Sequence, residues 1–83
     1  MLDGNDLERM IEHEKRRTAL EYQHETFADA LSDGIEVEIM AEAAIATALG
    51  ELLATVGEDD TLARLDALRE RVIAGAFQPR TLQ

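Results

Sequence analysis

The chain has 83 residues, no cysteine and a net charge of −10, with 18 acidic against 8 basic residues. A chain of this length holds at most one hydrophobic core, so the sequence predicts a single domain over residues 1–83. The absence of cysteine excludes disulfides and cysteine-based zinc sites. The acidic excess argues against direct nucleic-acid binding, because phosphate contacts need clustered Lys and Arg.

Abundant Ala, Leu and Glu with one proline and no tryptophan are typical of a helical protein. No apolar run approaches the roughly 18 residues that are needed to span a bilayer. The N-terminus lacks the basic and apolar regions of a secretion signal. We therefore expect an all-α, cytoplasmic protein with no membrane partner.

The first helix is predicted over residues 6–31, with Asp3, Asn5 or Asp6 as its N-cap. Its charged N-terminal half is expected to be a solvated extension or a partner-docking arm. One apolar stripe of this helix consists of Leu7, Ile11, Thr18 and Tyr22. Gly34 can adopt the left-handed conformation and is expected to end the helix.

The second helix, predicted over residues 35–56, is the most hydrophobic element. A helix that is apolar over most of its circumference is buried on more than one side, which implies a partner helix. The sequence predicts a dimer interface formed by Ile39, Ile45, Leu49, Leu52, Leu53 and Val56. Residues 35–39 alternate apolar and polar side chains, so a short strand is an alternative there.

A third, shorter helix is predicted over residues 61–74, because Gly57 is a suitable stop for the second helix and residues 58–60 supply acidic first-turn residues. Gly75 is expected to end it. The predicted architecture is a helical hairpin with a shorter third helix, forming a dimeric helical bundle. Self-association is expected because a domain this small buries only about 60% of the surface that its unfolded chain exposes.

The sequence gives little evidence for a catalytic site. There is no cysteine, and the one serine, Ser32, stands in a predicted turn. Apart from Gly50, the glycines stand where predicted helices begin or end, and they form no phosphate-binding loop. We predict no catalytic and no cofactor-binding residues.

Four side chains form the only candidate metal site. Glu21 and His24 have the Glu-x-x-His spacing that di-iron four-helix bundles use on their helices. With further carboxylates from the second helix, two copies of a hairpin could bind iron or manganese, which suit oxygen ligands with an imidazole. The candidate ligands are Glu21, His24, Glu38 and Glu42. The alternative is that His24, together with Arg17 or His13, satisfies Glu38 and Glu42 in a structural hydrogen-bonded pair.

Two functional hypotheses follow. The first is a small non-enzymatic protein–protein interaction module, such as a regulator, adaptor or accessory subunit, whose acidic surface engages a basic protein partner. The second is a metal-binding four-helix bundle assembled from two hairpins, with iron or manganese as the cofactor.

Overall fold

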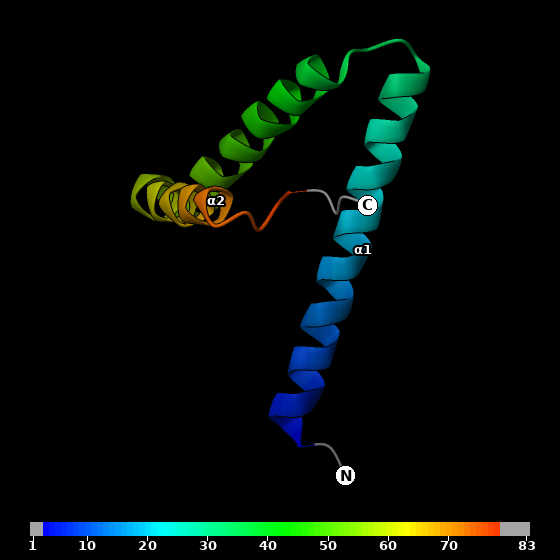
Figure 1. Ribbon diagram of the computed structural model, residues 1–83. Coiled ribbons are helices and arrows are strands. Elements are labelled where there is room, and N and C mark those ends of the chain that lie inside the picture. The colour runs from blue at the N-terminus through cyan, green and yellow to red at the C-terminus, as the bar shows by residue number, and fades with distance from the viewer. Residues whose placement is uncertain (1–2, 79–83) are drawn as a thin grey trace. The chain divides into compact units, whose positions relative to one another are not determined.

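The computed structural model describes residues 3–78 and confirms the all-α class. It contains two long helices, α1 (Gly4–Ser32) and α2 (Val37–Ile73) (Figure 1). By its contacts the chain divides into two units, Met1–Ala43 and Ala44–Gln83. The first unit holds α1, the following turn and the start of α2, and the second unit holds the rest of α2. The single domain over residues 1–83 stays a prediction.

α1 begins with a capped N-terminus. The carboxylate of Asp3 accepts a hydrogen bond from the backbone N–H of Asp6 at 2.8 Å, which satisfies one of the free N–H groups of the first turn. Asp3 is one of the three predicted N-caps. The helix therefore starts two residues earlier than the predicted residue 6, at Gly4.

α1 ends at a glycine-dependent turn. Gly34 has φ of 85°, its N–H donates to the carbonyl of Leu31 at 3.0 Å, and the N–H of Ile35 donates to the carbonyl of Ala30 at 3.0 Å. This pair of bonds is the Schellman motif, which satisfies carbonyls that the last turn leaves free. Residues 33–36 connect α1 to α2 and have the length of the loop in a helical hairpin.

The strand alternative for residues 35–39 is wrong. α2 begins at Val37, and the N–H of Met40 donates to the carbonyl of Glu36 at 3.1 Å as in a helix. Ile35 and Glu36 belong to the connection and are neither helix nor strand. The predicted start of the second helix at residue 35 is therefore two residues too early.

The predicted third helix is not a separate element, because residues 58–73 continue α2. Two helical segments meet at a kink at Gly57, whose φ of 85° and ψ of 175° are not helical. Figure 1 shows the ribbon of α2 changing direction in this region, where its colour passes from green to yellow. The predicted break at Gly57 is thus present, but the expected loop after it is absent, since the helix resumes at Glu58.

A side-chain hydrogen bond spans the kink. The hydroxyl of Thr61 donates to the carbonyl of Gly57 at 2.7 Å, and Thr61 is only 2% exposed. After Ile73 the chain ends α2 with a second Schellman motif, in which Gly75 has φ of 80° and the N–H of Ala76 donates to the carbonyl of Arg71 at 2.9 Å.

Very little of the described chain is buried. Within residues 3–78 the only buried residues are Ala30 and Thr61. Partly buried residues accompany each of them: Phe27, Met40 and Ala41 lie on either side of the 33–36 turn, and Leu52 and Val56 precede the kink. Each unit therefore has a small apolar corner where the chain bends, and neither has a large core.

The kink gives a prediction for Gly57→Ala. Residues other than glycine rarely adopt its φ and ψ, so we expect the free energy of unfolding to fall by about 1–3 kcal/mol. Gly50→Ala is the matched control, because Gly50 lies inside the helix with nothing within 4 Å of an added Cβ. It should raise the free energy of unfolding by about 0.5–1 kcal/mol. Chemical denaturation followed by circular dichroism measures both values, and equal stabilisation by both variants would show that residue 57 is helical in solution.

Candidate functional site

Exposed apolar side chains are the dominant surface feature. Seventeen large hydrophobic residues of the described chain are exposed, and they occur along both helices. Scattered single apolar residues are normal on a protein surface, but contiguous apolar faces mark sites of association. The candidate functional site of this chain is therefore a set of helix faces, of which three can be defined.

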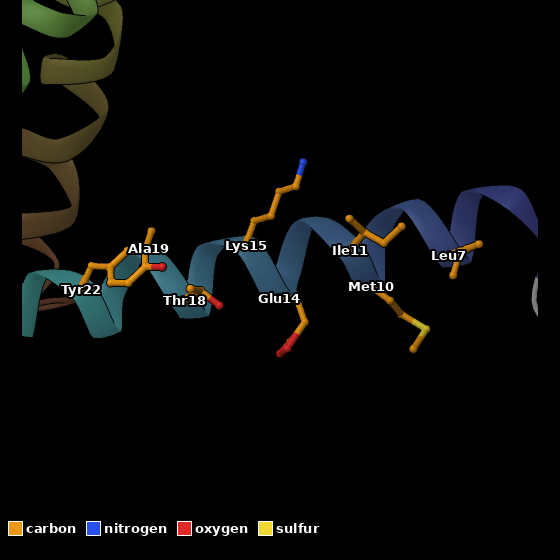
Figure 2. A pocket seen from close by; sticks show the side chains of 8 residues that line it. All are labelled: Leu7, Met10, Ile11, Glu14, Lys15, Thr18, Ala19 and Tyr22. Carbon is orange, nitrogen blue, oxygen red and sulfur yellow. The ribbon is translucent and has the colours of Figure 1, made fainter.

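The first face lies on the N-terminal half of α1, and we call it the α1 stripe. It is a shallow, open and largely apolar surface. The residues of the stripe predicted from the sequence all line it, and Figure 2 shows that all of its side chains project from one helix. Its members other than charged residues are Leu7, Met10, Ile11, Thr18, Ala19 and Tyr22, of which Thr18 carries a hydroxyl. Glu14 and Lys15 complete its lining, and Figure 2 shows them pointing to opposite sides of the helix.

The second face is the predicted dimer interface on α2. Ile39, Ile45 and Leu53 are exposed, with 56%, 58% and 49% of their surface accessible. Leu49, Leu52 and Val56 are partly buried. Helical periodicity places Ile45, Leu49, Leu52, Leu53 and Val56 on one broad side of α2 and Ile39 at its margin. The dimer interface itself stays a prediction. The exposure of these side chains in one copy permits it.

The third face lies on the part of α2 after the kink. Its apolar side chains are Leu62, Leu65, Leu68, Val72 and Ile73, all of them exposed. Three arginines accompany them: Arg64 pairs with Asp60, Arg69 pairs with Glu70 at 3.0 Å, and the guanidinium carbon of Arg71 lies 4.5 Å from the centre of the Phe77 ring. Residues 58–73 carry five acidic side chains and three arginines, so the arginines are local positive charges on a segment that is acidic as a whole.

Arg17 is the centre of an ion-pair network on α1. Its guanidinium donates to both carboxylate oxygens of Glu14, at 2.6 and 2.8 Å, and to Glu21 at 2.8 Å. The hydrogen bond to Glu14 and the charges of Glu14 and Glu21 raise the pKa of Arg17 above its usual value. The i, i+3 and i, i+4 spacings of opposite charges in the sequence predict that Arg16 and Arg17 balance Glu12, Glu14 and Glu21, and the ion pairs confirm this.

The four candidate metal ligands are not brought together within one copy. No group of three or more His, Asp or Glu side chains able to hold a metal ion occurs among residues 3–78. His24, Glu38 and Glu42 are exposed, and Glu21 is paired with Arg17. The site that two copies would assemble stays a prediction.

By length and composition, α2 is able to cross a membrane, and no residue of its most apolar stretch is buried. The statement that no stretch approaches a membrane span is therefore wrong. It counted only uninterrupted apolar runs, whereas here isolated glutamates separate long apolar stretches. The core helix of a soluble protein has the same length and composition, so this property alone does not identify a membrane protein.

No family model, curated protein or solved structure matches the chain. The function is therefore argued from the chain's own surfaces.

Elemental analysis tests the metal hypothesis. Because the four side chains do not converge in one copy, we expect the purified protein to contain less than stoichiometric iron or manganese, and to take up no iron(II) when it is added. His24→Ala should then behave as the wild-type chain does. Stoichiometric metal that is lost in His24→Ala would contradict this expectation and would favour a site assembled from two copies.

Proposed function

We propose that the chain is a non-enzymatic protein–protein interaction module, acting as a regulator, adaptor or accessory subunit. It acts as a cytoplasmic homodimer centred on the apolar face of α2, and its acidic surface engages a basic protein partner. The dimer and the partner serve the same purpose, because each covers helix surface that one copy leaves exposed.

The observation that carries the proposal is the near absence of buried side chains within residues 3–78. Fully burying one Leu, Ile or Met side chain stabilises a protein by about 1.5–3 kcal/mol relative to leaving it exposed. Covering even a few of the exposed residues of α2 therefore yields a free energy comparable to the whole stability of a small domain. A chain with this surface gains most by association with another helix.

The charge distribution supports a basic partner. Residues 35–60 contain seven acidic residues and no basic one. A strongly negative surface speeds the encounter with a basic protein and fixes its orientation. It also repels nucleic acid, which carries the same sign of charge.

A membrane span is the main competitor for α2, and the energetics disfavour it. At the centre of a spanning helix each Leu, Ile or Val contributes roughly −0.3 to −0.6 kcal/mol, while a carboxylate such as Asp costs about 2.5–3.5 kcal/mol. The stretch 39–56 has six such apolar residues and two glutamates, Glu42 and Glu51. The two carboxylates outweigh the six apolar side chains, so packing against protein is the better way to cover α2.

The dimer can be tested with a matched pair of substitutions. Ile45→Glu places a charge in the proposed α2 interface, and we expect it to shift the protein from dimer to monomer in sedimentation equilibrium at micromolar concentration. Thr47→Glu adds the same charge on the opposite side of the helix and should leave the dimer intact. A wild-type chain that sediments as a monodisperse 9.2 kDa species would contradict the dimer.

The basic partner can be tested by affinity purification from the native cell at two salt concentrations. We expect a protein of high isoelectric point to co-purify at low salt and to be lost as the salt concentration rises, because salt screens exposed charges over about 10 Å at 0.1 M. If only the chain itself is recovered at both salt concentrations, the basic partner is contradicted, while the proposed self-association is unaffected.

A further inference from the structure

We propose that the α1 stripe is covered by the C-terminal segment of α2, residues 58–73, from a second copy of the chain. The inference rests on the self-association proposed above and assigns α1 a part in it. Two copies that exchange this contact form a closed two-fold pair, because each supplies one stripe and one segment.

Both surfaces are apolar and exposed in a single copy. Met10 and Tyr22 represent the α1 stripe with 55% and 64% of their surface accessible, and Val72 and Ile73 represent the segment with 62% and 65%. An amphipathic helix normally buries its apolar side against another element. Here each of the two surfaces is a stripe on one side of a helix, so they can pack on each other as two helices do.

The charges on the edges of the two surfaces are complementary. Helical periodicity places Glu14 and Glu21 two turns apart on one edge of the α1 stripe. It places Arg64 and Arg71 two turns apart on the corresponding edge of the segment. When the helices pack face to face and antiparallel, the equal spacing brings Arg64 to Glu21 and Arg71 to Glu14 at the same time. Both glutamates also bond Arg17 of their own helix, Arg64 is paired with Asp60 and Arg71 lies over Phe77, so the contact between copies shares or exchanges these local partners.

In the same alignment Val72 of the segment lies opposite Ile11, and Leu65 lies opposite the β-branched side chain of Thr18, which can offer its methyl group. An antiparallel pair of two α1 helices has no such match, because it brings the acidic edges of both copies together and like charges repel. The α1 stripe is therefore better suited to the arginine-flanked segment than to a second α1.

The test exchanges one charge on each surface in separate chains. Glu21→Arg is made in one chain and Arg64→Glu in another, one of them is labelled with ¹⁵N, and the two are mixed for native mass spectrometry. Each variant alone meets a like charge in both contacts, so we expect its dimer to dissociate about ten-fold more readily than the wild-type dimer. In the mixture both contacts are again between opposite charges, so heterodimers should exceed the half expected for random pairing. A chain that carries both substitutions should dimerise as the wild-type chain does.

Asp6→Arg is the matched control. It changes the net charge equally and also breaks a pair with an arginine, since Asp6 accepts a hydrogen bond from Arg9. Asp6 lies on the side of α1 that faces away from the stripe, so its dimer should be as strong as that of the wild-type chain. Circular dichroism checks that each variant keeps its helix content.

Three results would overturn the proposal. Random proportions of heterodimer in the mixture would show that Glu21 and Arg64 of different copies do not meet. If the mixture gave random proportions while the doubly substituted chain still regained the wild-type thermal stability, the contact would lie within one copy. Dimers of unchanged strength in both single variants would remove this contact and leave the α2 interface. A monomeric wild-type chain would remove this contact together with the proposed self-association.

Discussion

An α-helix that carries large apolar side chains on several sides has to place them against another surface, and this constraint governs the whole chain. Within each of the two units the helical chain bends at one glycine, Gly34 or Gly57, and the two buried residues among residues 3–78, Ala30 and Thr61, lie within four residues of these bends. The remaining apolar faces of α1 and α2 extend along straight helix, where a single helix cannot cover its own side chains. Hydrogen bonds satisfy the backbone of each helix, but the apolar side chains need a second surface.

The polar side chains of the chain act locally and do not replace a core. Asp3 caps α1, Thr61 bonds the carbonyl at the kink, and Arg17 links two glutamates of its own helix. These contacts are between residues three or four positions apart, so they stabilise single helices. Stability of the chain as a whole therefore has to come from contacts between helices, and the acidic and arginine-rich faces determine which helices can meet.

The sequence predicted the helical class and the places where the chain bends, because glycines at positions 34, 57 and 75 allow backbone angles that end or kink a helix. It overestimated the break at Gly57: residues 58–60 are well suited to the first turn of a helix, so the helix resumes at once and no loop forms. Apolar periodicity predicted that the faces of α2 need covering. The periodicity does not identify the surface that covers these faces, because that surface depends on contacts between chains.

The candidate metal site shows the same limit. Glu21 and His24 do lie one turn apart on α1. Whether Glu38 and Glu42 approach them depends on how two helices pack, and residue spacing within one helix does not determine that packing. In one copy Glu21 is paired with Arg17 and the other three side chains are exposed. Local pairing of opposite charges along a helix needs no tertiary contact, so it is present in a single copy.

The dependence of thermal stability on protein concentration tests the central claim most directly. If association supplies the core that one copy lacks, mass action requires the midpoint of unfolding to rise with concentration. Circular dichroism melts over a hundred-fold range of concentration should then show midpoints that increase steadily, with shallow or absent transitions at the lowest concentration. A cooperative transition whose midpoint is the same at every concentration would contradict the account, because it would show that a single copy already has a sufficient core.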